Sequence, residues 1–350
     1  MSCGRTTMNR SHLAATLCLG VLAMLLGGQA QPANEDDPIA RLDAALERGN
    51  PRDRAVRVIV AMSTDRNPML RSNAIEAMQP LPERALPLTQ AGLDDGHPAV
   101  RYAAVVTAGM QDFRSLNDAI RPLLGDENPS VRSAARYALH RLGEEVDLTP
   151  LAGALRSADP GLRANTAQLL GLIGDASAVP MLKEAAAEPM PRVGAAQANV
   201  VRMQIAEAIV RLGDDSELST LRAGAWNSVG EVRVVAINAM GAVGDRKMIP
   251  AFEQMLTDRF QPEPPEIRLA AAGALARMGQ FAGQAVAMKL SRDANPIVRS
   301  QAAWVLGWFA DGPSLGRLGQ MLDDETPVVR IAAAASIIRR SAEGPTEAAD

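Results

Sequence analysis

One short phrase recurs nine times along this 350-residue chain and constrains its fold more than any other feature. In each copy an arginine directly follows Leu, Val or Ile, and small residues come after it. Successive arginines lie 30, 31, 31, 39, 31, 35, 31 and 31 residues apart. A period of this length indicates stacked structural repeats that share one core. The nine arginines are Arg71, Arg101, Arg132, Arg163, Arg202, Arg233, Arg268, Arg299 and Arg330.

Each phrase also predicts where a helix begins and ends. Seven phrases carry proline three residues before the arginine, and five of these prolines follow a residue suited to capping: Asn67, Asn128, Asp159, Asn295 and Thr326. Proline loses no hydrogen bond in the first turn, and the capping oxygen accepts from free backbone N–H groups. Five phrases carry a glycine eleven residues after the arginine, which is expected to end the helix: Gly143, Gly174, Gly213, Gly244 and Gly279.

The apolar pattern between these signals predicts an amphipathic helix. Positions −1, +3, +6, +7 and +10 relative to the arginine are nearly all apolar and fall on one helical face. A second, less regular apolar pattern fills the rest of each unit, for example at residues 178–185. Each unit is therefore predicted to be a helical hairpin. Stacked hairpins explain how a chain with only 3% aromatic residues forms a core.

The spacing of proline, Val-Arg, the small residues and Leu-Gly over residues 40–340 resembles HEAT repeats, particularly the short bacterial repeats of phycobilin-lyase-type families. The resemblance implies an all-α fold, a right-handed α-solenoid (α-α superhelix) of about nine helical-hairpin HEAT repeats. It also implies that the arginine-bearing helix is the second of each pair and lines the concave surface.

The first thirty residues have the layout of a secretory signal peptide. Arg5 and Arg10 precede an apolar run from Leu13 to Leu26, and small residues end at Ala30, after which cleavage is expected. The alternative is an uncleaved membrane anchor, although a 14-residue apolar run is short for a bilayer span. The predicted location of the mature chain is the periplasm of a bacterium or the extracellular space.

The chain is predicted to consist of four segments. They are a signal peptide at 1–30, a disordered linker at 31–37, the HEAT-repeat solenoid at 38–340 and a disordered tail at 341–350. Both cysteines, Cys3 and Cys18, lie in the signal peptide, and a thiol-free mature chain suits an oxidising compartment. The two longest repeats indicate insertions at 188–199 and 260–266, which are predicted to be surface loops.

The residues that carry no core function are the candidates for binding. Positions +5 and +9 lie away from the apolar face and vary between repeats. Trp304 and Trp308 lie on the same side of one helix, and tryptophan is enriched at binding hot spots. The alternative for this pair is that it packs against a neighbouring repeat or covers the C-terminal end of the stack. The arginines are predicted to form a stripe facing an acidic partner, and the alternative for them is that they are simply solvated. The partner-binding candidates are Tyr137, Arg141, Glu207, Arg211, Arg277, Trp304 and Trp308.

The repeated arginine itself is predicted to be structural. Because it stands at the edge of the apolar face in every unit, it is expected to meet an acidic or carbonyl group of the adjoining repeat.

Catalytic and metal-binding patterns are not found in the predicted mature chain. It has two histidines, His97 and His140, no cysteine, and no spacing typical of a zinc, phosphate-loop or calcium-loop site. The sequence therefore predicts no metal, no cofactor and no enzymatic activity. Residues 1–30 contain two arginines and no acid, so their removal changes the net charge from −4 to −6. An acidic chain argues against nucleic acid as a partner.

These observations lead to one principal hypothesis and two alternatives. The principal hypothesis is a non-catalytic exported scaffold that binds a protein or peptide on its concave surface. The first alternative is a structural subunit of an envelope complex that uses its loops or ends. The second, implied by the family resemblance, is an enzyme similar to a bilin lyase or isomerase.

Overall fold

The computed structural model describes residues 50–257, 262–309 and 311–342. Within these ranges the chain forms eighteen α-helices and no strand. The predicted signal peptide and linker, and residues 343–350 of the predicted tail, lie outside the described residues. Residues 341–342 belong to a helix, so the tail prediction began too early.

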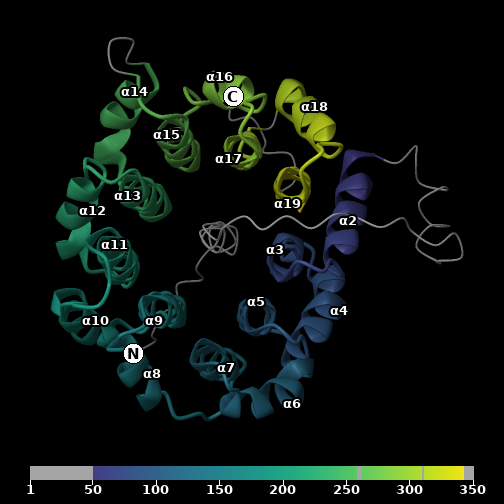
Figure 1. Cartoon of the computed structure of the whole chain (residues 1–350). Coiled ribbons are helices and arrows are strands. Elements are labelled where there is room, and N and C mark those ends of the chain that lie inside the picture. The colour runs from purple at the N-terminus through teal and green to yellow at the C-terminus, as the bar shows by residue number, and fades with distance from the viewer. Residues whose placement is uncertain (1–49, 258–261, 310, 343–350) are drawn as a thin grey trace, which may run out of the picture.

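The helices form nine pairs in the described part of the chain, with one helix of each pair on the outside and the other on the inside (Figure 1). The outer helices are α2 (Pro51–Met62), α4 (Pro82–Leu93), α6 (Asn117–Ile120), α8 (Thr149–Leu155), α10 (Val179–Ala187), α12 (Leu218–Gly224), α14 (Ile249–Thr257), α16 (Gln284–Leu290) and α18 (Gly312–Met321). The inner helices are α3 (Pro68–Met78), α5 (Pro98–Gln111), α7 (Pro129–Arg141), α9 (Pro160–Ile173), α11 (Ala195–Arg211), α13 (Gly230–Val243), α15 (Pro265–Arg277), α17 (Pro296–Leu306) and α19 (Pro327–Ala342). The predicted all-α solenoid is confirmed, and the inner helices are the arginine-bearing ones.

The solenoid closes into a ring. The last helix, α19, packs against α2 and α3, the first helices that the structure describes (Figure 1). One apolar core crosses this contact, because Ile59 of α2, Met78 of α3 and Ile338 of α19 belong to the same buried cluster. The concave surface expected of an open superhelix is therefore the inner wall of a ring. A small rotation per repeat accumulates along a solenoid, and here it completes a full turn.

The local signals for helix ends are found where the sequence predicted them. All seven prolines occupy the first position of an inner helix, and four predicted caps, including Asn128 and Asp159, accept hydrogen bonds from backbone N–H groups. The five predicted glycines adopt positive φ, as at Gly174 with φ 80°. An L side chain is strained in this conformation, so glycine ends these helices at the least cost.

The longer insertion is only partly a loop. Residues 188–194 connect α10 to α11, as predicted, but residues 195–199 are helical and lengthen α11 to 17 residues. Of the shorter insertion, residues 260–261 lie outside the described residues and residues 265–266 are not a loop but begin α15. Between them, Glu263 accepts hydrogen bonds from Arg233 at 2.6 and 2.9 Å.

Candidate binding site on the inner wall of the ring

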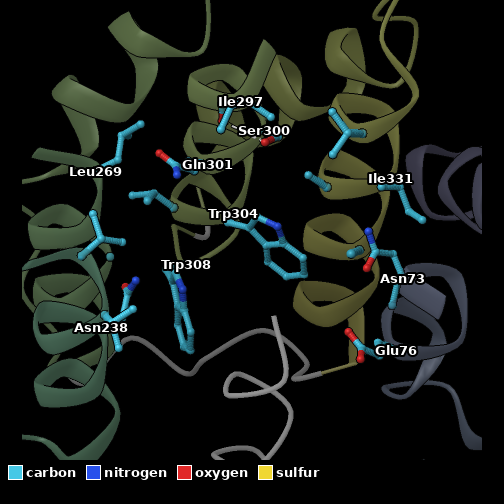
Figure 2. Close-up of a pocket in the computed structure, with 18 of the residues that line it drawn as sticks. Asn73, Glu76, Asn238, Leu269, Ile297, Ser300, Gln301, Trp304, Trp308 and Ile331 are labelled. Carbon is cyan, nitrogen blue, oxygen red and sulfur yellow. Dashed lines mark hydrogen bonds between the residues drawn. The ribbon is translucent and has the colours of Figure 1, made fainter. Parts of the chain in front are cut away.

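A cavity of about 240 Å³ lies on the inner wall, between helices α3, α11, α13, α15, α17 and α19 (Figure 2). It therefore spans the place where the ring closes. Its lining includes both aliphatic side chains and side-chain amides: Val234, Leu269, Ile297, Ile331, Asn73, Gln204, Asn238 and Gln301. A mostly apolar cavity with a few convergent polar groups is typical of a ligand site.

Two tryptophans dominate the cavity. Trp304 projects into it from α17 and Trp308 from the turn that directly follows α17, and both are half-buried (Figure 2). The guanidinium carbon of Arg339 lies 5.3 Å from the ring centroid of Trp304 and 4.4 Å from that of Trp308. The guanidinium of Arg277 lies 5.7 Å from the Trp308 centroid. These cation–π contacts hold the indole rings in place, so a ligand loses little side-chain entropy when it packs against them.

The two arginines are themselves fixed to neighbouring inner helices. Arg277 donates from Nη1 to the carbonyl oxygen of Asn238 on α13 at 3.2 Å. Arg339 donates from Nη2 to the carbonyl oxygen of Trp304 at 3.1 Å. Of the predicted candidates, the structure therefore brings together Arg277, Trp304 and Trp308, and it adds Arg339.

Two other candidates lie elsewhere on the wall. Arg141 is exposed at the end of α7, on the part of the ring that does not line the cavity. Arg211 ends α11 and forms an ion pair with Glu207 one turn earlier in the same helix.

The structure departs from the prediction at Tyr137 and Glu207, which are not open to a partner. Tyr137 is only 1% exposed, and burial raises the pKa of its hydroxyl to about 12. It fills the space beside Gly109 of α5, where an added Cβ would lie 2.8 Å from the tyrosine ring. Glu207 is 6% exposed and is engaged by Arg211. Their position in the repeat places them on the inner side, but the neighbouring helices cover them.

Glu76 was not predicted, although it occupies the same repeat position as Tyr137 and Glu207. Its half-buried side chain faces the cavity from α3, and burial raises its pKa to about 8 (Figure 2). Burial raises the pKa of the Tyr102 hydroxyl on α5, and the charge of nearby Glu76 raises it further. Near neutral pH, Glu76 is therefore largely protonated and presents an O–H donor.

The repeated arginines lie between repeats and do not line the cavity. Four of them bind a carboxylate in the connection that precedes the next inner helix, in the pairs Arg71–Asp95, Arg101–Asp126, Arg233–Glu263 and Arg299–Asp324. Four others donate to backbone carbonyl groups, namely Arg132, Arg163, Arg268 and Arg330. Arg202 is exposed. Most of these arginines thus contact the acidic and carbonyl groups that a structural role requires.

The best buried of these pairs is Arg101 with Asp126. Arg101 donates from Nε and Nη2 to the two carboxylate oxygens at 2.8 and 2.9 Å, and the Asp126 side chain is only 5% exposed. Burial favours the neutral form of Asp126, but hydrogen bonds from Arg101 and from the backbone N–H of Asn128 outweigh it and hold the pKa of Asp126 below its usual value.

Within the described ranges, no three His, Cys, Asp or Glu side chains lie close enough together to hold a metal ion. None of the described helices is long and apolar enough to cross a membrane.

Comparison with solved structures finds matches of low similarity. Human deoxyhypusine hydroxylase in complex with glycerol is 19% identical, with a TM-score of 0.37, over 75% of this chain and 97% of that one. The complex of CpcE and CpcF of phycocyanin lyase from Nostoc sp. PCC7120 is 20% identical, with a TM-score of 0.37, over 73% of this chain and 94% of that one. A structure of microtubule polymerases with TOG domain arrays is 14% identical, with a TM-score of 0.21, over 82% and 86%.

A search of curated protein sequences finds no significant match. A sequence profile of HEAT repeats, in contrast, matches residues 85–160, 150–233 and 256–338, which together make up more than half of the chain. The chain therefore belongs to the HEAT-repeat family.

Proposed function

We propose that this protein is an exported, non-catalytic HEAT-repeat scaffold that binds a segment of a partner protein or a peptide on the inner wall of its ring. The observation that carries the proposal is the cavity around Trp304 and Trp308, whose indole rings are half-buried and held by two arginines. Tryptophan and arginine are the side chains most enriched at binding hot spots, particularly in pockets that exclude water.

The chemistry of the cavity also favours a peptide. Aliphatic side chains such as Leu269 and Ile331 accommodate apolar side chains, while the amides of Asn238 and Gln301 are able to donate to and accept from a peptide backbone. The part of the proposal that concerns export rests on the sequence of residues 1–30.

A second candidate function is assembly through the outer turns of the ring. Two aromatic side chains outside the cavity favour it, since Trp226 is 56% exposed and Phe281 is 65% exposed on connections between helices. Assembly through the two ends of the described solenoid is less favoured, because α19 is already packed against α2.

A pull-down from an envelope extract tests these two functions against each other. The bait is the predicted mature chain, residues 31–350, beside a Trp304→Ala/Trp308→Ala variant and a matched Trp226→Ala control. We expect wild type and the control to retain one partner and the double variant to lose it while its circular dichroism remains helical. Ile297→Gln, at a cavity residue that is 36% exposed, provides a milder second variant with little risk to folding.

Capture that survives the double variant but is lost in Trp226→Ala would assign binding to the outer turns. Capture of nothing by any of the four proteins would contradict both functions.

A further inference from the structure

The cavity on the inner wall contains polar groups that the protein itself does not use. Four side-chain amides line it, those of Asn73, Gln204, Asn238 and Gln301. In the part of the chain that the structure describes, none of these amides forms a hydrogen bond with another protein group. The Oε1 atom of Gln301 is buried without a partner. Because an unpaired buried polar atom costs free energy, a ligand that completes such bonds gains affinity.

The two tryptophans add hydrogen-bond donors to these amides. Within the described ranges, the indole N–H groups of Trp304 and Trp308 donate to no protein acceptor. Each ring therefore presents both an apolar face and an N–H to the cavity (Figure 2). Burial raises the pKa of Glu76 to about 8, so near neutral pH this side chain contributes an O–H donor as well.

The arginines of the wall, in contrast, are engaged with the wall. Arg277 donates to the carbonyl oxygen of Asn238, Arg339 donates to that of Trp304, and both lie over indole rings. The groups that remain for a ligand are amides, indole N–H groups and aliphatic side chains, which are all neutral. We therefore expect the ligand to be uncharged where it contacts the cavity.

The wall has no backbone edge with which a ligand could pair. Apart from Trp308, the residues that line the cavity stand on inner helices, whose backbone N–H and C=O groups bond along the helix. A β-strand would therefore bury N–H groups that need side-chain acceptors. An α-helix bonds its own backbone groups and would leave most of the amides and indole N–H groups unused. The cavity instead suits an extended chain that presents mainly acceptors.

From this arrangement we infer that the cavity binds a proline-rich segment of a partner protein in the polyproline II conformation. Its proline rings pack against Trp304 and Trp308, and its carbonyl oxygens accept hydrogen bonds from the indole N–H and amide groups. The inference rests on the proposed function and names the chemistry of the partner.

Three properties of such a segment match the cavity. A polyproline II helix has no internal hydrogen bonds, so its carbonyl groups are open to donors, while its prolines have no N–H to leave unpaired. Proline loses no side-chain rotamer freedom when it is buried. Aromatic side chains are the usual lining of grooves that bind this conformation, because the ligand is already ordered before it binds.

A neutral sugar chain is the less suitable ligand. Sugar rings also pack on indole rings and bond to amides, but the aliphatic side chains of Leu269, Ile297 and Ile331 offer their hydroxyl groups no partner.

Fluorescence anisotropy with the predicted mature chain, residues 31–350, tests the inference. The probes are labelled peptides of about twelve residues, or about 37 Å at 3.1 Å per residue in polyproline II. They share two serines and two leucines and have Pro, Ala or Thr at all other positions; a labelled cello-oligosaccharide is the fourth probe. We expect the Pro peptide to bind about tenfold more tightly than the others. Its affinity should be the same at about 0.05 and 0.5 M salt, because no charge is involved.

Two variants locate the interaction. Asn238→Leu removes an amide and keeps a similar volume, and Trp304→Phe removes an indole N–H and keeps an aromatic ring. Each is expected to bind the Pro peptide about five- to tenfold more weakly. The matched control is Gln168→Leu, at the same repeat position of α9 as Asn238 has in α13 but outside the cavity, and it should bind as wild type does. Circular dichroism checks that every variant remains helical.

The inference would be overturned if the Ala peptide, the Thr peptide or the sugar bound as tightly as the Pro peptide, or if no probe bound. Unchanged affinity in both variants, or an equal loss in the control, would also overturn it. Partner capture that still depends on Trp304 and Trp308 would then leave the proposed function in place. The inference and the proposed function fail together only when that capture is also lost.

Discussion

Two kinds of contact between repeats hold this ring together, and they differ in what fixes them. At four joints between consecutive repeats the repeated arginine binds a carboxylate, and at the joint between α5 and α7 Arg101 and Asp126 form a buried, two-bonded ion pair. At the closing joint, the corresponding Arg330 donates to the carbonyl oxygens of Asp324 and Glu325 at 2.8 and 3.2 Å. An ion pair between Arg54 and Asp323 bridges this joint at 2.8 Å, with side chains 34% and 72% exposed.

The difference indicates which interaction fixes the orientation of one repeat on the next at each kind of joint. A two-bonded arginine–carboxylate pair is directional and fixes how one repeat sits on the next. Apolar contact is not directional. The closing joint therefore has a continuous core, but the angle between its helices is less tightly fixed. We therefore expect the four joints with an arginine–carboxylate pair to be the more sensitive to loss of charge, and the closing joint to depend mainly on its core.

The largest effect is expected from Arg101→Ala. This change leaves the carboxylate of Asp126, 5% exposed, without its guanidinium partner, and breaking a buried pair in this way costs about 3–5 kcal/mol. Urea unfolding followed by circular dichroism measures the loss. The double variant Arg101→Ala/Asp126→Asn also removes the unpaired carboxylate and should recover part of the lost stability. If no stability is recovered, packing and not charge dominates this joint.

Truncation of the core at the closing joint is expected to come next. Ile59 of α2 is fully buried in the cluster that α2 and α3 share with α19, so Ile59→Ala should cost about 2–4 kcal/mol. Faster amide exchange in α2 and α19 should accompany the loss. Ile205→Ala, at a similarly buried isoleucine of α11, is the control, and faster exchange in α2 and α19 in that variant would contradict a local effect.

A pH-dependent effect of intermediate size is expected from Glu76, which lies on α3 beside the closing joint. Because its folded pKa is raised to about 8, the folded state holds the proton more tightly than the unfolded state, whose pKa is the ordinary 4.5. The stabilisation is complete below pH 4.5 and is lost as pH rises through 8. Relative to Glu76→Gln, wild type should lose on the order of 1–2 kcal/mol over this window, since solvent screens a half-buried group. A pH-independent difference in urea unfolding would contradict the shift.

The smallest effect is expected from Arg54→Ala, despite its place at the closing joint. An ion pair this exposed contributes at most about 1 kcal/mol and is weakened by salt. Thermal unfolding at low and high salt measures both features. A loss as large as that of Arg101→Ala would mean that the Arg54–Asp323 pair, and not the core, closes the ring.

The helices of the ring were predictable because their signals are local. A proline and its capping residue act within one turn, as Asn128 and Pro129 do at the start of α7, and Gly174 ends α9 by its own backbone conformation. Ring closure was not predictable in this way. It depends on the sum of many small rotations between repeats, and no single residue encodes that sum.

The inner wall was predictable only in part, for a related reason. The repeat position places Trp304 and Arg277 on the correct side of their helices, and Trp308 in the turn directly after α17, but the exposure of such a side chain depends on the neighbouring helix. Tyr137 is covered because Gly109 of α5 leaves room for its ring, a contact between repeats that one repeat's sequence does not reveal.

Closure also bears on how such a chain is able to change over generations. An open solenoid gains or loses a repeat at either end and keeps its remaining contacts, because each unit touches only its neighbours. In a ring, α19 and α2 meet only when the repeats together complete one turn. Deleting one hairpin would separate them by about the 8–10 Å that packed helices span, and would expose the core at both faces. Selection therefore acts on the number of repeats as strictly as it acts on any single residue.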